Sequence, residues 1–351
     1  MSIDAAIVVR ELSDVIGSRV AGSRQEAAAA AYLTGLVEGE GWELAVSDFE
    51  YRGWRPETRA HLDLDGSERR GSIEGVALPY TLPTPADGAA GILVRGGVAT
   101  IIEGRIVCER FYIEAADGTR VGRVLLEPYD DLRPIPNPRA TDSLPTIVLG
   151  GQHAAILRAA TEERTPVRLS AGSGEHLARG RNLVARTGSG GGPELLLVAH
   201  YDSVIGSPGA NDNASGVAVA LLVMEHAIRA GHPVRLLLSA AEELMFRGAE
   251  AYLAQLQDQD RVGELAACLC LDMLGVGDEL KLRAPEAGCW YQAGLDLGGE
   301  SFLHRELPSS DHWVFHQIGL PSAQLTRQSD PHYHSPRDNS DRILAETLVE
   351  S

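Results

Sequence analysis

Between residues 181 and 341, short uninterrupted apolar runs alternate with longer segments in which apolar residues recur at helical spacing. Apolar runs of this length, bounded by turn residues, are typical of strands buried on both faces of a sheet. The pattern therefore predicts an α/β fold with a mixed, mainly parallel sheet flanked by helices. The expected buried strands are Glu194–Ala199, Val234–Ser239, Ala266–Leu271 and Leu320–Leu325, and the expected helices are Ala214–Arg229 and Phe246–Gln257.

One more expected strand, Asn182–Arg186, precedes this series. The Gly-rich turn Gly188–Pro193 separates it from Glu194–Ala199, and this arrangement predicts a β-hairpin. The turn is not a phosphate-binding loop, because it lacks a Gly-Lys-Ser/Thr ending and leads into a strand instead of a helix.

The first 54 residues predict two helices followed by a strand. Apolar residues of Ile3–Ile16 recur at helical spacing, and Ser23 is placed to cap a second helix through Ala27–Val37. The segment Trp42–Phe49 then has the composition of a strand. We expect this piece to belong to the same domain as residues 181–351.

The character of the chain changes between residues 55 and 180. Short β-like runs alternate there with Pro- and Gly-rich turns, and no cluster of His, Cys or acidic residues has the spacing of metal ligands. This pattern predicts a β-rich domain inserted into the main one. We therefore expect a discontinuous main domain, 1–54 and 181–351, and an inserted domain, 55–180. The β-like runs are Gly91–Val94, Gly104–Cys108, Arg123–Leu126 and Thr146–Leu149.

Charge and targeting signals narrow the classes of function. The 351 residues carry 31 basic and 49 acidic side chains, a net charge of −18, which argues against binding to nucleic acid or to an anionic membrane surface. No apolar run approaches the ~18 residues of a membrane span. The N-terminal residues lack a basic region with a long apolar core, so no signal peptide is predicted and a cytoplasmic location is expected.

Residues able to bind a metal follow four of the expected strands. Histidine nitrogen and carboxylate oxygen are ligands that zinc prefers, and open α/β sheets place their ligands beside the carboxyl ends of strands. Five such residues suffice for two ions with a shared carboxylate, and a sixth acid is then free to act as a general base. These candidates are His200, Asp212, Glu242, Glu243, Asp272 and His334.

Each candidate alone has an ordinary structural explanation. Asn-Asp-Asn before a helix is an N-cap signal, an adjacent Glu pair is common in the first turn of a helix, and a His at a strand end is usually a hydrogen-bonded structural residue. Independent structural residues need not all fall at one edge of a sheet, so the joint pattern favours a metal site. Neither the zinc motif H-E-x-x-H nor the serine-hydrolase motif G-x-S-x-G is present.

The motifs around these candidates resemble, in order, those of the M28 family of zinc-dependent aminopeptidases. The resemblance implies a zinc exopeptidase-like fold, and the inserted domain is similar to the protease-associated (PA) domain of several members. A further loop, Ser310-Asp311-His312, resembles a family motif near the site or is a structural loop. The motifs are His200-Tyr201-Asp202-Ser203, Gly209-Ala210-Asn211-Asp212-Asn213, Ala241-Glu242-Glu243, Leu271-Asp272-Met273 and Tyr333-His334-Ser335-Pro336.

The resemblance implies a role for each residue. It gives one zinc to His200 and Asp272, the other to Glu243 and His334, and makes Asp212 the bridge between the ions, with a cis peptide bond after it. It makes Glu242 the general base that deprotonates water. It also implies that Asp202 orients His200 through the other ring nitrogen and that Tyr333 polarises the scissile carbonyl.

The expected function is that of a dizinc metallopeptidase, most simply an aminopeptidase acting on peptides with a free N-terminus. Two Zn²⁺ ions are the expected cofactors, although cobalt or manganese suits the same ligand types. The alternatives are a carboxypeptidase or another amide hydrolase on this scaffold, or a non-catalytic homologue that binds a partner. The oligomeric state is not indicated by the sequence.

Overall fold

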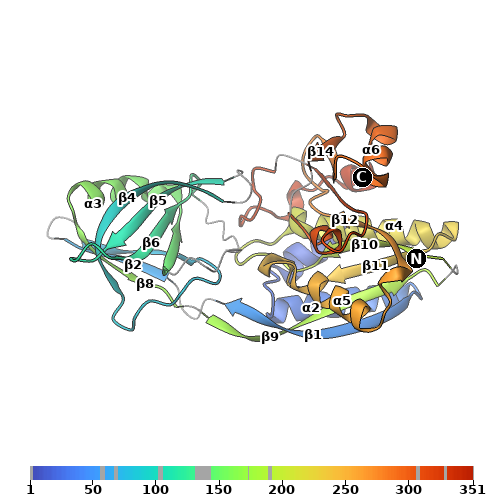
Figure 1. The fold of residues 1–351 in the computed structure, drawn as a ribbon, viewed down its shortest axis with the longest axis horizontal. Helices are drawn as coiled ribbons and strands as arrows, with labels where there is room; N and C mark the ends of the chain where they lie inside the picture. Colours follow the sequence, from blue (N-terminus) through green and yellow to red (C-terminus); the bar gives the residue numbers. More distant parts are fainter. Residues whose placement is uncertain are drawn as a thin grey trace. The chain divides into compact units, whose positions relative to one another are not determined.

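The protein forms two compact units in the computed structural model, residues 1–51 with 178–351 and residues 52–177 (Figure 1). The sequence places the corresponding boundaries at 54/55 and 180/181. The structure describes residues 3–55, 60–66, 70–101, 106–130, 144–172, 174–188, 192–305, 309–327 and 330–350.

The first unit is built on one eight-stranded sheet with the strand order β1-β9-β11-β10-β12-β15-β13-β14. Its centre is parallel, since β10 pairs in parallel with both β11 and β12, and β12 with β15. Antiparallel pairs occur between β9 and β11 and between β13 and β15, so the sheet is mixed, as predicted. The strands are β1 (Glu43–Arg55), β9 (Gly174–Arg186), β10 (Glu194–His200), β11 (Val234–Ser239), β12 (Leu265–Leu271), β13 (Leu280–Ala284), β14 (Leu303–Arg305) and β15 (Ser322–Arg327).

The predicted hairpin between β9 and β10 is wrong. In the described part of the sheet, β11 lies between them, and β9 pairs antiparallel with β11 from Leu183–Leu238 to Arg186–Arg235. The strand that follows β10 along the chain returns beside it in parallel through helix α4, the usual βαβ connection. Strand β11 therefore pairs with the edge of β10 at which β9 would have to lie in a hairpin.

Helices cover both faces of this sheet, which explains why the strands are apolar throughout. Alternate residues of β10 point to opposite faces: Leu197 and Ala199 pack in a cluster with α1, α2 and α4, whereas Leu196 and Val198 pack with α5 and α7. No helix in the described ranges is long and apolar enough to cross a membrane. The helices of this unit are α1 (Ala5–Arg10), α2 (Arg24–Gly39), α4 (Gly216–Ala230), α5 (Arg247–Asp258), α6 (Cys289–Gly298), α7 (His312–His316) and α8 (Ala345–Glu350).

The helix ends follow the local signals of the sequence. Ser23 caps α2 by accepting a hydrogen bond from the Glu26 N–H, at 3.1 Å, as predicted. Gly231 ends α4 in the left-handed conformation, with φ 72°, which glycine adopts without steric cost. The first predicted helix is divided, because α1 passes into a π-helical turn at Glu11–Ile16.

The second unit is a closed barrel with the strand order β2-β3-β7-β6-β5-β4-β8. Its pairs are antiparallel except β6 with β7, and the β-rich character agrees with the sequence prediction. The helix α3 (Ala154–Glu162) was not predicted, and Gly104 of one predicted run lies outside the described residues. The strands are β2 (Ala60–Asp65), β3 (Arg70–Ala77), β4 (Ala89–Ile101), β5 (Ile106–Glu114), β6 (Arg120–Leu126), β7 (Thr146–Leu149) and β8 (Pro166–Ser170).

Candidate metal centre

Parallel pairing brings the predicted candidates to one edge of the sheet. In the register of β10 with β11, His200 lies opposite Ser239, and Glu242 and Glu243 follow in a short turn. In the register of β10 with β12, Val198 lies opposite Cys270. Two residues further along the chain in each case, His200 and Asp272 therefore come to the same level of the sheet. The strand register therefore accounts for the convergence of His200, the glutamate pair and Asp272, which are far apart in sequence.

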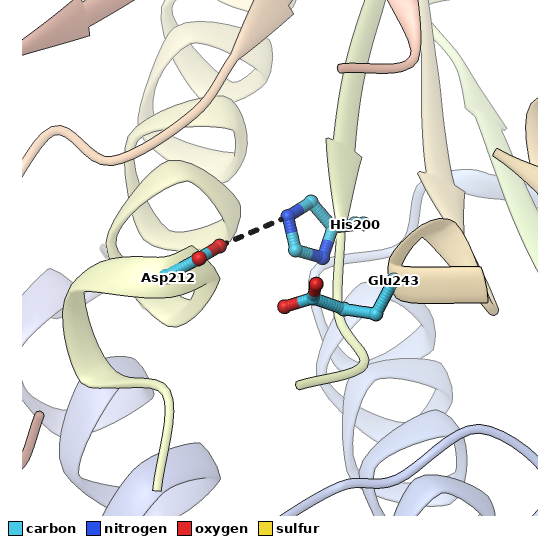
Figure 2. A group of neighbouring side chains, drawn as sticks. All are labelled: His200, Asp212 and Glu243. Carbon is cyan, nitrogen blue, oxygen red and sulfur yellow. Dashed lines mark ion pairs between the residues drawn. The ribbon is translucent and has the colours of Figure 1, made fainter. Parts of the chain in front are cut away.

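Asp212 lies between two histidines. Its Oδ1 is 3.2 Å from His200 Nε2 and its Oδ2 is 3.1 Å from His334 Nε2. His334 Nε2 is also 3.3 Å from Glu243 Oε2. Figure 2 shows Asp212 at the start of the α4 segment and Glu243 on the opposite side, with their carboxylates directed to the space beside the His200 ring. One carboxylate thus offers an oxygen to each side of the cluster.

His200 also faces a second group of acids. Its Nε2 is 3.8 Å from Glu242 Oε2 and 3.7 Å from Asp272 Oδ1. Ligand atoms close enough together to share one ion occur in two sets, His200–Asp212–Glu243 and His200–Glu242–Asp272. All six predicted candidates are brought together, and all are buried: His200, Asp212, Glu242, Glu243, Asp272 and His334.

The backbone around this cluster is held in unusual conformations. Eight non-glycine residues of the described chain have positive φ; four of them lie within three residues of a candidate, and a fifth is the candidate His334. Such conformations cost of order 1–3 kcal/mol each and persist only where the surroundings impose them, which is common at functional sites. The five are Ala241, Met245, Phe246, Met273 and His334.

The asparagines on either side of Asp212 join the α4 segment to the loop that follows β12. Asn211 Oδ1 accepts hydrogen bonds from the N–H groups of Gly275 and Val276, at 2.8 and 3.1 Å. Asn213 Oδ1 accepts from the N–H of Met273, at 3.2 Å, and of Gly216, at 2.9 Å, so the predicted N-cap role is also filled. The peptide bond between Asp212 and Asn213 is cis, as the resemblance implied.

Gly216 is required where α4 meets the end of β12. A Cβ atom at this position would lie 2.2 Å from Asn213 Oδ1 and 2.2 Å from the Leu271 carbonyl oxygen. Any larger residue would therefore separate the helix from the strand whose next residue is Asp272. The φ of Gly216 is −64°, which every residue can adopt. Glycine is therefore needed here for close packing and not for its backbone conformation.

Asp202 fixes the position of the glutamate pair. Its carboxylate oxygens accept hydrogen bonds from the main-chain N–H of Glu242, at 3.0 Å, and of Glu243, at 3.2 Å. Its main-chain oxygen lies 3.2 Å from His200 Nδ1, and its carboxylate is 3.5 Å from the same nitrogen. Asp202 thus contacts three of the candidates without occupying the centre of the cluster.

Two buried residues that the sequence analysis did not single out support Asp212. Asp338 accepts hydrogen bonds from the N–H groups of Asn211 and Asp212, at 2.7 and 3.1 Å. Arg19 is fully buried and donates to main-chain oxygens of the segment between His200 and Asp212, including Tyr201 at 2.6 Å and Gly209 at 2.9 Å. The signal available for Asp338 was its place four residues after His334, in the same polar loop.

Electrostatics in the cluster favour a bound cation. Burial lowers the pKa of His334, but Glu243 and Asp212 outweigh it and raise that pKa to about 10. Burial raises the pKa of Glu242 well above its usual value, and His200 opposes this only in part. Protons therefore partly neutralise the buried carboxylates when no metal is bound. A divalent ion would compete with these protons for the same atoms.

The hydrogen-bonding pattern fits this interpretation. In the described part of the chain, Glu243 Oε1 and Asp272 Oδ1 are buried without a hydrogen-bond partner. Leaving such atoms buried and unsatisfied costs free energy unless an ion takes the place of the missing donor or acceptor. Oxygen and imidazole donors in this number are also the set that zinc accepts.

Tyr333 and the Ser310-Asp311-His312 loop adjoin the cluster. The Tyr333 ring is stacked on the His334 ring, with centroids 3.8 Å apart. The three loop residues are buried, and the Ser239 hydroxyl at the end of β11 donates to Asp311 Oδ2. Burial raises the pKa of Asp311 to about 7. The loop therefore packs beneath the cluster, and its residues do not form a nucleophile-base-acid triad.

Comparison with known proteins agrees with this fold. Residues 182–351 match the model of Peptidase family M28. The structure of BSAP, a zinc aminopeptidase from Bacillus subtilis, has the same fold, with a TM-score of 0.76 at 21% identity over 99% of this chain and 91% of that one.

Two relatives are similar in sequence. Aminopeptidase YwaD from Bacillus subtilis is 31% identical over 178 residues, which cover 45% of this chain but only 39% of that relative. The probable lipoprotein aminopeptidase LpqL from Mycobacterium tuberculosis is 27% identical, with 93% of this chain and 77% of the relative covered. The chain thus aligns with less than half the length of the first relative and with most of the second.

Proposed function

We propose that the protein is a dizinc aminopeptidase that removes N-terminal residues from peptides. The observation that carries the proposal is the convergence of the six buried candidates, which come from the carboxyl ends of β10, β11 and β12, from the segment before α4 and from the loop after β15. The names of the relatives, aminopeptidases in both cases, support the same activity.

The ligands divide into two sets that share Asp212. His200 and Asp272 would hold one ion, and Glu243 and His334 the other. The distances of 3.2 and 3.1 Å from the two Asp212 oxygens to the histidine nitrogens support a bridging carboxylate. Zinc ions held by these residues would lower the pKa of water and polarise the substrate carbonyl.

Glu242 would act as the general base. It takes one proton from the attacking water as the new C–O bond forms, and it returns that proton to the peptide nitrogen as the C–N bond breaks. The main-chain N–H of Glu242 donates to Asp202 Oδ1 at 3.0 Å, which holds the residue in place. Tyr333, beside His334, would donate a hydrogen bond to the carbonyl oxygen of the substrate.

The test measures amine release from free-amino aminoacyl amides and short peptides, with N-acetylated versions of the same substrates as the matched control. Activity on the free amines alone, lost with a chelator and restored by Zn²⁺, is expected. Equal activity on acetylated substrates would identify another amide hydrolase, and release from the carboxyl end a carboxypeptidase. Two bound metals without turnover of any substrate would indicate a binding protein.

The remaining features belong to the same proposal. We propose that the barrel is the PA-like module predicted from the sequence, on the support of its closed β-architecture with one helix. A cytoplasmic location stays a prediction, against which stands the relative named a lipoprotein aminopeptidase. Cell fractionation with an antibody to the native chain separates a cytoplasmic protein from an exported or membrane-anchored one.

A further inference from the structure

Gln324 is a buried amide in the middle of the sheet of the first unit. It lies on β15, opposite Cys270 of β12 on one side and opposite Arg283 of β13 on the other. Its side chain is 3% exposed, so its donor and acceptor must both find partners within the protein. None of the proposed roles in hydrolysis uses this residue.

The orientation of this amide is fixed by its neighbours. The Ser309 hydroxyl donates to Gln324 Oε1 at 2.8 Å, and Arg283 Nη1 reaches the same oxygen at 3.4 Å and Ser309 Oγ at 2.8 Å. A guanidinium group can only donate, so the atom facing Arg283 must be the amide oxygen. The Nε2 donor of Gln324 is therefore directed the other way.

That donor meets Asp272, which the proposed function makes a metal ligand. Gln324 Nε2 lies 2.9 Å from Asp272 Oδ2. The other oxygen, Oδ1, has no hydrogen-bond partner among the described residues and lies 3.7 Å from His200 Nε2. One oxygen of the carboxylate is thus held from behind while the other points at the centre of the cluster, the arrangement that orients a metal ligand.

The two proposed metal positions differ in this respect. At the first, Gln324 supports Asp272, and His200 Nδ1 lies 3.2 Å from the Asp202 carbonyl oxygen. At the second, Glu243 Oε1 and His334 Nδ1 are buried without a hydrogen-bond partner in the part of the chain that the structure describes. Only the first position therefore has both of its own ligands oriented by neighbouring groups.

We propose that Gln324 is a positioning residue that, held by Arg283 and Ser309, orients Asp272 so that the His200–Asp272 position binds its ion more tightly than the Glu243–His334 position. This rests on the proposed ligand roles. The loss of such a supporting group costs about 10–100-fold in metal affinity. A neutral amide suits the role, because it donates to Asp272 without adding charge beside the ion.

The experiment titrates the metal-depleted full chain with Co²⁺ alone, followed by visible absorption and by competition with a chromophoric chelator. The wild-type chain should bind two ions in distinguishable steps. In Gln324→Met, which keeps the length of the side chain but removes its donor, we expect only the tighter step to weaken, by about 10–100-fold. Thermal unfolding of the same samples reports on folding.

A double-mutant cycle shows which of the two metal positions is responsible for the tighter binding step. With the second position disabled by His334→Ala, Gln324→Met should weaken the remaining ion. In an Asp272→Asn background the same substitution should have no further effect, because its partner is already altered. The matched control is Thr326→Val on the same strand, whose hydroxyl makes a 3.4 Å contact with the Arg327 carbonyl oxygen and no other hydrogen bond among the described residues; it should leave both steps unchanged.

A milder variant keeps the test decisive if Gln324→Met does not fold. Ser309→Ala removes the hydroxyl that holds Gln324 Oε1 and should weaken the same step by less than about tenfold. Equal weakening of both steps, or none, in a chain that binds two ions and hydrolyses peptides overturns the proposal while the aminopeptidase stands. Two ions without hydrolysis overturn the function alone, and a chain that binds none overturns both.

Discussion

The two units of the protein bury different kinds of side chains. In the described part of the barrel unit, the buried charged residues are Arg123 and Glu127, and the interior is otherwise apolar or carries threonine. The first unit buries a cluster of carboxylates and histidines at one edge of its sheet. A sheet of parallel strands brings strand ends of one kind together, whereas antiparallel strands in a closed barrel alternate in direction. The architecture thus explains why, among the described residues, the candidate ligands gather in the first unit.

The largest expected effect separates chemistry from metal binding within the first unit. Glu242→Gln keeps the shape of the proposed base but removes its ability to accept a proton. Amide hydrolysis should fall by at least about 10²–10⁴-fold, the usual contribution of a general base. Metal content, measured by mass spectrometry after dialysis, should stay unchanged. Loss of metal together with activity would make Glu242 a ligand.

The next test removes the proposed bridge. Asp212→Ala should empty both metal positions, because each histidine nitrogen faces one of its oxygens. The measurement is the metal content of the purified variant at micromolar Zn²⁺. Glu346→Ala, an exposed acid on α8, is the control and should retain both ions. Two ions at full occupancy in the Asp212 variant would disprove the bridging role.

The third test changes the apolar core of the barrel instead of the metal site. Phe111 on β5 is fully buried, and Phe111→Ala should destabilise the second unit by about 3–5 kcal/mol through lost burial and a cavity. Denaturant unfolding should show this loss, while metal content stays that of the wild type, because every proposed ligand belongs to the first unit. Val98→Ala, at an exposed barrel position, should change the stability by less than about 0.5 kcal/mol. Loss of metal in Phe111→Ala would show that the units are coupled.

A smaller effect concerns a buried carboxyl that is not itself a candidate ligand. Burial first, and then Asp202, raise the pKa of Glu26 on α2 from 4.5 to about 8. The unfolded chain loses this proton near 4.5, so the folded state loses stability as the pH rises from 4.5 to 8. Glu26→Gln should therefore gain stability relative to the wild type across this window, by more than about 1 kcal/mol at pH 8.

Thermal unfolding at pH 5 and pH 8 measures this gain. Glu38→Gln, at an exposed position on the same helix, is the matched control. Its stability relative to the wild type should be the same at both pH values. A Glu26 variant that gains nothing at pH 8 would show that this carboxyl is ionised in the folded protein at no cost.

Much of the fold of the first unit was predictable because its strands and helices have strong local signals. Val234–Ser239 has the predicted bounds, and the predicted helix 214–229 differs from α4 by residues at its ends only. Strand order was not predictable in the same way, since the turn between β9 and β10 has the composition of a hairpin whatever strand lies between them. Pairing partners are decided by tertiary packing, which local composition does not record.

The candidate site was predictable as far as its residues stand at strand ends. His200, Asp272 and the glutamate pair are conspicuous there because metal-binding residue types follow apolar runs. The roles of Gln324 and Arg19 were not predicted, since a Gln within a strand or an Arg near the N-terminus has no distinctive spacing. Their importance depends on contacts made after folding, such as the 2.9 Å bond from Gln324 to Asp272.

The strand order also has a consequence in polymer terms. Strands β1 and β9 are neighbours in the sheet, and ion pairs join Asp48 to Arg181 and Glu50 to Arg179, so the two strands run in opposite directions. Topologically, the entire barrel is therefore the loop of one hairpin. The entropy of closing a loop grows only with the logarithm of its length, about 0.6 kcal/mol for each doubling. Inserting a whole folded module between β1 and β9 therefore costs little more loop-closure entropy than a long turn.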